Sequence, residues 1–229
     1  MSTARIPENL THTLEAIAEA ARRAGREPDS VRLVAVSKTV DAEMIRAAYS
    51  AGQREFGENR VPELAGKRAC LPPDCQWHMI GHLQRNKVRP AVRAAAWLHS
   101  IDSTDLLQRL DRIAAEERAT PTVLLQVNVS GEASKYGISP DHAPALADAA
   151  AACHFCSCRG LMTMAPYGLS EPELRRVFAA LRQLRDRLAV SSGLDLPELS
   201  MGMSGDFPQA IAERPTMVRI GSAIFRARP

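Results

Sequence analysis

Val31-Arg32-Leu33-Val34-Ala35-Val36-Ser37-Lys38-Thr39 has the composition of a strand that is buried on both faces. Valine recurs in it, and β-branched residues favour extended backbone. The segment places Lys38 at the carboxyl end of the strand, where a buried ammonium group is costly unless it is used. Desolvation favours the neutral amine, whose free lone pair can attack an aldehyde and form an imine. The alternative is a lysine whose alkyl chain extends from the strand end into water.

Seven further strand patterns follow, and a helical pattern separates each strand from the next. The predicted strands are 31–39, 54–59, 76–81, 96–101, 122–128, 157–165, 198–202 and 216–221. The predicted helices are 9–25, 41–52, 63–68, 86–95, 104–118, 139–153, 171–191 and 207–213. This alternation predicts one α/β domain over residues 1–229, a (β/α)8 TIM barrel with an extra N-terminal helix over about 9–25.

The competing architecture is an open, doubly wound sheet. Such a fold usually has a glycine-rich phosphate-binding turn directly after its first strand. Residues 37–40, Ser-Lys-Thr-Val, contain no glycine and do not match that turn. The closed barrel is therefore our prediction.

The composition limits the class of function. Apolar residues make up 45% and charged residues 24%, and the net charge of +3 is too small to indicate nucleic-acid binding. No apolar run reaches the length of a membrane span, and residues 1–8 lack a basic segment followed by an apolar one. We therefore expect neither membrane association nor secretion. The five cysteines are an odd number, which indicates reduced thiols in a cytoplasmic protein rather than a disulfide framework.

In a barrel of this kind the functional site lies at the carboxyl ends of the strands. Polar residues and glycines gather at those ends, while the strand bodies are apolar. The candidates are Lys38, Glu58, Asn59, Gly81, His82, Asp102, Ser103, Asn128, Thr163, Met164, Gly202, Ser204, Arg219, Gly221 and Ser222. Loops are polar in any protein, so polarity alone does not indicate a site. Two of the loops and one arginine give a more specific signal.

The two loops indicate a phosphate site. Residues 200–206 (SMGMSGD) follow the seventh strand, and Gly221-Ser222 follows the eighth. Barrels often bind phosphate with these two loops, because glycine lets backbone N–H groups approach the oxygens and serine adds a hydroxyl donor. We therefore expect an anion to bind between them.

Arg219 lies inside the last strand, where a permanent charge needs a partner. One interpretation is a structural ion pair with Glu58 or Asp102. The other is a donor to a ligand acceptor such as a pyridine nitrogen. An aldehyde-reactive lysine, a phosphate cup and a donor for a ring nitrogen together describe a site for pyridoxal 5'-phosphate (PLP). Because arginine donates to the nitrogen without protonating it, the ring is a weaker electron sink than it is beside an aspartate.

Six motifs of the chain resemble those of the pyridoxal phosphate homeostasis protein family, which comprises short relatives of the alanine racemase N-terminal barrel. They are residues 35–38 (AVSK), 56–59 (FGEN), 77–87 (WHMIGHLQRNK), 160–164 (GLMTM), 200–204 (SMGMS) and 219–225 (RIGSAIF). The resemblance implies a fold-type III PLP-binding barrel without the C-terminal β domain of the racemases. It covers the chain nearly from end to end.

The resemblance also implies the roles of individual residues. Lys38 holds the cofactor as an internal aldimine, and Arg219 faces the pyridine nitrogen. The remaining cofactor-binding residues that it implies are Asn59, beside the ring, and Ser204, Gly221 and Ser222, at the phosphate.

As a function, the resemblance implies a protein that carries and buffers PLP in vitamin B6 homeostasis, with no established catalysis. Racemases of this fold add a second domain, which together with the partner subunit supplies a tyrosine acid/base. Without that domain we expect an open cofactor site and a monomer, with PLP-dependent apoenzymes as recipients. The alternative is a weak amino-acid racemase or transaminase in which His82, Tyr136 or Tyr167 is the acid/base.

Other features have simpler interpretations. Residues 153–158 (CHFCSC) resemble half a metal site, but structural zinc usually needs a second pair, so we expect free thiols and no metal. The basic run 82–93 is interpreted as a solvated helix face, with docking of recipient enzymes as the alternative. Lys135 lies in a loop, and we prefer a role in gating or anion steering. Pro62 and Arg226 depart from the residues usual in the family, and we expect them to affect affinity rather than attachment.

Overall fold

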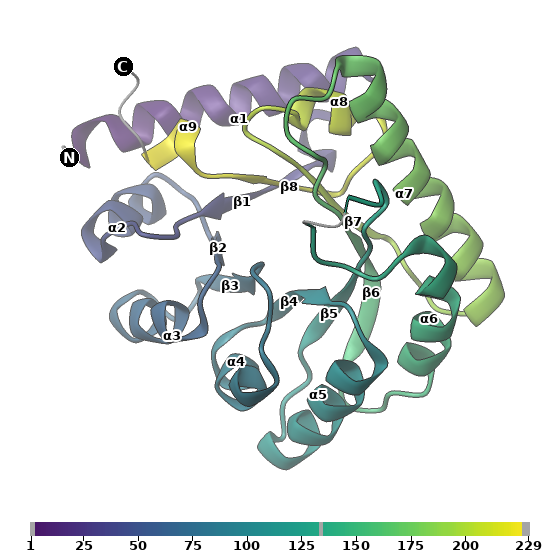
Figure 1. Cartoon of the computed structure of the whole chain (residues 1–229). Coiled ribbons are helices and arrows are strands. Elements are labelled where there is room, and N and C mark those ends of the chain that lie inside the picture. The colour runs from purple at the N-terminus through teal and green to yellow at the C-terminus, as the bar shows by residue number, and fades with distance from the viewer. Residues whose placement is uncertain (1–2, 133–134, 226–229) are drawn as a thin grey trace.

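Within residues 3–132 and 135–225, which the computed structural model describes, eight parallel strands form a closed barrel. Each strand pairs with its neighbour in the sequence, and the last pairs with the first. Helices alternate with the strands and surround them (Figure 1). The predicted TIM barrel with an additional N-terminal helix is confirmed. Because all strands are parallel, their carboxyl ends meet on one face of the barrel.

The strands are short and the helices vary in length. The strands are β1 Arg32–Val36, β2 Glu55–Glu58, β3 Gln76–Met79, β4 Trp97–Ile101, β5 Thr122–Gln126, β6 Ser157–Met162, β7 Glu198–Met203 and β8 Met217–Ile220. The α-helices are α1 Ile6–Arg23, α2 Ala42–Ser50, α3 Val61–Cys70, α4 Val88–Ala94, α5 Thr104–Glu117, α6 Ala143–Ala151, α7 Glu171–Ser192, α8 Phe207–Ala212 and α9 Ser222–Phe225. The 3-10 segments are η1 Thr3–Arg5, η2 Pro28–Ser30, η3 Arg85–Lys87 and η4 Pro140–His142.

Capping residues set several helix ends. At the start of α5, the Ser103 hydroxyl accepts a hydrogen bond from the Leu106 N–H at 3.3 Å. At the start of α7, the Glu173 carboxylate accepts the backbone N–H of Ser170 at 2.8 Å, as in a capping box. The same helix ends at Gly193, whose φ of 70° is the left-handed conformation that glycine adopts readily.

Most element boundaries differ from the prediction by one to four residues, and three differences have a local cause. α1 begins at Ile6 rather than at residue 9, because Pro7 occupies the first turn, where a missing N–H is tolerated. β6 ends at Met162 rather than at residue 165, shortly before Pro166, which cannot donate to a strand ladder. α9 was not predicted, since a segment of 4 residues cannot show a helical period.

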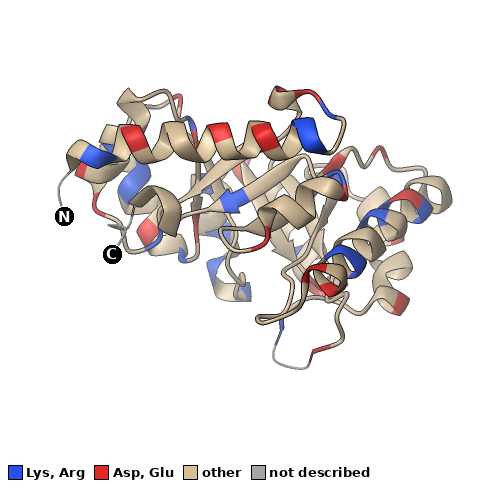
Figure 2. Ribbon diagram, turned by 90° about the horizontal axis from the view of Figure 1, so that it is seen from above, with Lys and Arg blue, Asp and Glu red and all other residues tan. Residues whose placement is uncertain are grey.

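The N-terminal helix α1 covers the barrel where the first and last strands meet. Figure 1 shows it beside α8 and α9, against which it packs. Its inner face is buried, and Ile6, Leu10 and Ile17 are each at most 2% exposed. The Asn9 side chain donates a 3.1 Å hydrogen bond to the Ile224 carbonyl in α9. Figure 2 shows acidic and basic residues interspersed along the helices, in keeping with the small net charge of +3.

The apolar core has two layers. The larger layer lies between the strands and the surrounding helices. A smaller cluster inside the barrel consists of Val34, Leu124, Met162 and Met217. Buried polar side chains share the interior with that cluster. In the described part of the chain, no helix combines the length and apolarity of a membrane span.

Gly160 in β6 lies so close to β7 that a larger residue does not fit, because an added Cβ atom would overlap the Glu198 carbonyl oxygen. We predict that Gly160→Ala lowers the free energy of unfolding by about 3 kcal/mol, since the β7 backbone must shift. Urea denaturation measures the effect. Gly66→Ala in α3 is the control, because nothing lies within 4 Å of its added Cβ, and better helix propensity should stabilise it by about 1 kcal/mol. Equal effects of the two changes would contradict the close approach.

Candidate functional site

A cavity of about 590 Å³ opens at the carboxyl ends of the strands. Residues from the ends of β1, β2, β3, β5, β7 and β8 line it, together with α2 and α9. Every residue that the sequence analysis proposes for cofactor binding lines it, namely Lys38, Asn59, Ser204, Arg219, Gly221 and Ser222. The fold therefore brings together side chains that lie nearly a whole chain length apart in the sequence.

Lys38 lies beyond the strand rather than in it. β1 ends at Val36, and Lys38 occupies a turn in which Thr39 has a φ of 60°. A β-branched residue in this left-handed region is strained and persists only where its surroundings hold it. Lys38 is exposed at the cavity, so the expectation of a lysine buried in the strand end was wrong, because the turn lifts it clear of the sheet.

A second lysine holds this turn. Lys67 on α3 donates to the Ser37 carbonyl at 2.7 Å, to Glu58 at 2.8 Å and to Glu63 at 2.6 Å. Glu63 in turn accepts the backbone N–H of Thr39 at 2.6 Å. The backbone on both sides of the cavity lysine is thereby fastened to α3. We refer to Ser37, Glu58, Glu63 and Lys67 as the turn cluster.

Glu58 is the buried member of the turn cluster, with no exposed surface. Its carboxylate accepts the Ser37 hydroxyl at 2.5 Å as well as the Lys67 ammonium. Burial raises the pKa of Glu58, and the bonds from Lys67 and Ser37 oppose that rise. Its Oε2 atom is buried and has no hydrogen-bond partner among the described residues. The charged form of this carboxylate therefore depends on Lys67.

Arg219 extends from β8 through the barrel interior to the cavity and is 4% exposed. Its guanidinium donates to the Ser200 hydroxyl at 2.5 Å and to the Thr163 carbonyl at 2.8 Å. Burial lowers the pKa of Arg219 to about 10, and the nearby Asp206 carboxylate opposes that change. The group is therefore still a cation at neutral pH.

The interpretation of Arg219 as an ion-pair partner of Glu58 or Asp102 was wrong. Glu58 lies between the sheet and α3, where it pairs with Lys67. Asp102 lies 3.6 Å from His82. An arginine carries five N–H donors, and the described residues accept two of those of Arg219. Donors are therefore left for a ligand in the cavity.

The loops after β7 and β8 meet on one side of the cavity. The Ser222 hydroxyl donates to the Ser204 hydroxyl at 3.1 Å. Asp206 accepts a backbone N–H of its own loop at 2.5 Å and so holds that loop in place. Gly221 permits a close approach of the chain, since a Cβ atom there would stand 2.7 Å from the Val36 carbonyl oxygen. The two predicted phosphate loops are thus in direct contact.

His82 and Tyr136 line another part of the cavity. Their rings stack with the centroids 4.4 Å apart. Asp102 lies 3.6 Å from His82 Nδ1, and burial raises the pKa of Asp102. Tyr167 is fully exposed and is not among the lining residues. Of the acid/base residues considered for an enzyme, His82 and Tyr136 thus face the cavity.

Sequence reasoning missed part of the lining. Met44 has only the helical spacing of a core residue, and Phe225 belongs to the short α9. Gln126, which is 2% exposed, lines the cavity and donates to the Tyr136 carbonyl at 3.1 Å. No local pattern separates such residues from ordinary core residues. The strand-end candidates that lie away from the cavity are Glu58, Asp102, Ser103, Asn128, Thr163 and Gly202.

The cysteines of residues 153–158 belong to a tight turn. Sγ atoms of Cys153 and Cys156 and a carboxylate oxygen of Asp111 lie within 4.8 Å of one another. The same carboxylate accepts the backbone N–H groups of residues 154, 155 and 156. All five cysteines of the chain are free thiols. Asp111 thus stabilises the turn between α6 and β6.

The basic run 82–93 is largely neutralised by α5. Arg85 pairs with Asp105, and both Arg89 and Arg93 pair with Glu117. These pairs fit a solvated helix face better than a docking surface for recipient enzymes.

The two departures from the family pattern differ in their consequences. Pro62 lies in the first turn of α3, where a helix needs no N–H from it. Arg226 lies outside the described residues. Lys135 is not among the residues that line the cavity. Its position therefore gives no support to Lys135 as an alternative to Lys38 for imine formation.

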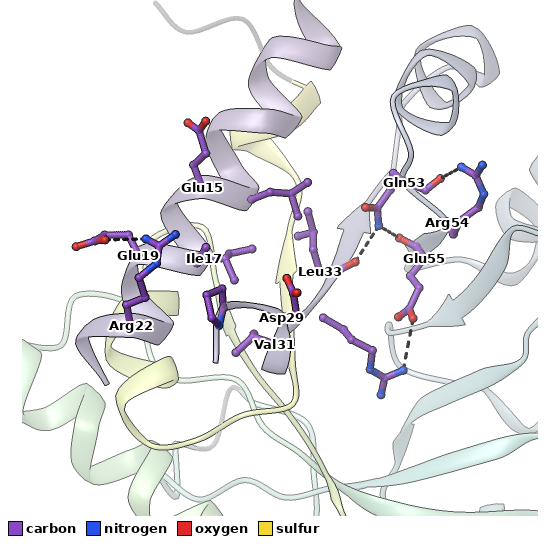
Figure 3. Close-up of a pocket in the computed structure, with 14 residues that line it drawn as sticks. Glu15, Ile17, Glu19, Arg22, Asp29, Val31, Leu33, Gln53, Arg54 and Glu55 are labelled. Atoms are coloured by element: carbon purple, nitrogen blue, oxygen red, sulfur yellow. Dashed lines mark hydrogen bonds and ion pairs between the residues drawn. The ribbon is translucent and has the colours of Figure 1, made fainter. Parts of the chain in front are cut away.

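A larger and more open hollow, of about 740 Å³, lies at the opposite end of the barrel. Figure 3 shows it between α1 and the amino ends of β1 and β2, with Glu55, Gln53 and Arg54 on one side and Glu15 and Glu19 on α1. It contains no lysine. The chemistry predicted for the site therefore lies in the smaller cavity.

Comparisons with known proteins agree with this geometry. Residues 8–229 match the family model described as the alanine racemase N-terminal domain. A pyridoxal phosphate homeostasis protein of Pseudomonas aeruginosa is 45% identical over 229 residues, covering 100% of this chain and 97% of the relative. The chain belongs to the pyridoxal phosphate homeostasis protein family. The resemblance inferred from the motifs is thus confirmed.

Solved structures show the shared fold of this homeostasis family. PipY of Synechococcus elongatus, with PLP bound, has a TM-score of 0.82 at 43% identity, and the match covers 91% of this chain and 99% of PipY. Alanine racemase from Corynebacterium glutamicum has a TM-score of 0.69 at 20% identity, with 94% of this chain and 62% of the racemase covered. The racemase likeness extends to the barrel alone.

In this homeostasis-family protein, the turn cluster predicts a strong effect of Lys67→Met. The change leaves the buried Glu58 carboxylate without its cation, so the free energy of unfolding should fall by about 3–5 kcal/mol. Urea denaturation at neutral pH measures the loss. Lys87→Met is the matched control, because the Lys87 amine has no ion pair within the described ranges, and its stability should change by less than about 0.5 kcal/mol. Equal losses would show that the cluster does not stabilise the turn.

Proposed function

We propose that this protein binds PLP covalently through the Lys38 amine and carries and buffers the cofactor in vitamin B6 homeostasis. The supporting observation is the convergence of Lys38, Arg219 and the two serine loops on one cavity. The naming of its relatives supports the same function, as does the bound PLP in PipY.

The residues of the cavity suit the parts of PLP. When bound, PLP supplies an aldehyde, which condenses with an amine and releases water. Lys38 is the amine, so the cofactor is held as an internal aldimine. Arg219 donates to the pyridine nitrogen as a fixed cation that does not give up its proton. The remaining contacts that we propose are Asn59 beside the ring, and Ser204, Gly221 and Ser222 at the phosphate.

Exchange rather than catalysis fits the setting of the lysine. Lys38 is exposed, and an amine that water reaches allows the imine to form and hydrolyse, whereas protected carbanion chemistry needs water excluded. We propose accordingly a cytoplasmic monomer that passes PLP to PLP-dependent apoenzymes.

A visible absorption spectrum of the purified protein incubated with PLP tests the attachment. We expect an imine band in the violet that is lost on borohydride reduction, with a mass increase on the peptide containing Lys38. Lys38→Ala should abolish both signals, because no amine remains at that position. Lys135→Ala, which removes the rival lysine, is the matched control and should keep both. Reduction products at Lys135, or a band that survives in Lys38→Ala, would overturn the assignment.

The alternative function is a weak amino-acid racemase or transaminase. The observation that favours it is the stacked pair His82 and Tyr136 at the cavity, with Asp102 near the imidazole. A carboxylate beside an imidazole can orient it for proton transfer. The two rings thus offer a second proton-transfer group besides Lys38.

Incubation of the PLP-loaded protein with single amino acids tests this alternative. If Tyr136 is the acid/base, racemisation or transamination should appear in the wild type and fall at least about a hundredfold in Tyr136→Phe. Tyr167→Phe is the control, since Tyr167 lies away from the cavity. Absence of turnover with every amino acid would refute the enzyme alternative and leave only the carrier function.

A further inference from the structure

A row of polar side chains crosses the barrel interior from its amino end to Arg219. His99 Nδ1 lies 3.0 Å from the Ser200 hydroxyl, which accepts a 2.5 Å hydrogen bond from Arg219. His99 Nε2 lies 2.9 Å from His78 Nδ1. His78 Nε2 lies 3.3 Å from Glu55 Oε2. Consecutive members come from different strands, β8, β7, β4, β3 and β2, so the barrel itself assembles the row.

The two ends of the row fix the direction of every bond in it. Arg219 can only donate, so the Ser200 oxygen accepts and its own proton is left for His99 Nδ1. His99 then holds its proton on Nε2 and donates it to His78 Nδ1. His78 likewise holds its proton on Nε2, which faces a carboxylate oxygen of Glu55 that can only accept. Both histidines are thus neutral, and both are Nε2–H tautomers.

The surroundings leave the row few other partners. His78, His99 and Ser200 have no exposed surface. His78 Nε2 and Glu55 Oε2 are buried 3.3 Å apart, and neither makes a well-aligned hydrogen bond with any of the described residues. The His78 ring stacks on Trp97 with the centroids 5.6 Å apart. This donor and this acceptor face each other and form the last pair of the row, at the amino end of the barrel.

Protonation of the histidines would break this arrangement. Burial lowers the pKa of His78, and it lowers the pKa of His99 well below its usual value. An imidazolium at His99 would direct an N–H at the Ser200 hydroxyl, whose own proton would then have no acceptor among the described residues. The charged groups that face the pair are Arg32 from β1, Glu55 from β2, Glu198 from β7 and Arg219 from β8.

We propose that Glu55, His78, His99 and Ser200 are positioning residues that orient the Arg219 guanidinium toward the cavity through a one-directional chain of hydrogen bonds. Glu55 anchors this chain at the hollow in Figure 3, where it is labelled. The role of Arg219 toward PLP rests on the proposed function, whereas the direction of the chain does not depend on it.

Nitrogen NMR of protein with ¹⁵N-labelled histidine tests the direction without PLP. His78 and His99 should both show the neutral Nε2–H pattern at pH 7.5, with signals assigned from His78→Gln and His99→Gln. Glu55→Leu should release His78 from that tautomer, whereas Glu55→Gln keeps an acceptor oxygen and should preserve it. An Nδ1–H tautomer or an imidazolium at either position would overturn the proposal.

The positioning role is tested by PLP titration of Ser200 variants. Ser200→Ala removes the link between His99 and Arg219, and the Kd for PLP should rise about tenfold, as for one lost hydrogen bond to a charged group. Ser200→Thr retains the hydroxyl and should restore most of the affinity. Equal Kd values for the wild type and Ser200→Ala would refute the role. Failure of the wild type to bind PLP would instead refute the proposed function. The NMR result would still show whether the hydrogen bonds between Glu55 and Arg219 run in the proposed direction.

Acidification provides an independent readout. Between pH 7.5 and 5.5 an unfolded chain binds protons at its histidines, near their ordinary pKa of about 6.5, but the buried pair does not. The unfolded state then binds more protons, so stability falls as the pH falls. We expect the melting temperature to decrease over this range and to decrease less in His99→Gln. His78 and His99 signals that titrate like free histidine would overturn the proposal.

Discussion

The position of the cavity lysine depends on a single ammonium group, that of Lys67. It joins the carbonyl before Lys38 to two carboxylates on β2 and α3, and one of these carboxylates holds the N–H that follows Lys38. A strained left-handed Thr39 is tolerated because these bonds compensate for it. The Lys38 amine lies at the mouth of the barrel, whereas the Lys67 side chain beneath it is only 11% exposed and pairs with the fully buried Glu58 and the partly exposed Glu63. Rigidity is thus supplied from outside the sheet, while the lysine itself stays accessible.

The interior of this barrel differs from the apolar filling that TIM barrels usually have. Apolar side chains form one small cluster, and the remaining space holds two histidines, a serine and an arginine. Buried polar groups are tolerated only when they are satisfied, and here each one faces a partner on another strand. The polar interior thereby links the strands to one another as well as to the cavity.

The fold and the residues of the cavity were largely predictable, whereas the contacts between them were not. Strand and helix periods identified the barrel, and polar residues at strand ends identified Lys38, Asn59 and Arg219. The exposure of Lys38 was not predictable. β1 ends two residues before Lys38, and the composition of the segment does not show where the strand ends. The partner of Glu58 was misjudged for a related reason. In a strand, successive residues face opposite sides, and Glu58 faces the helices rather than the interior.

The pairing of β1 with β8, reinforced by the bond from Asn9 to Ile224, has a consequence for folding. The cavity combines residues 36–44 with residues 203–225, so it exists only once the two ends of the described chain have come together. Contacts so distant in sequence form late and slowly, since a long loop must be closed before they bring any gain. A nascent chain emerging from the ribosome therefore has no competent ligand site until its last strand has docked.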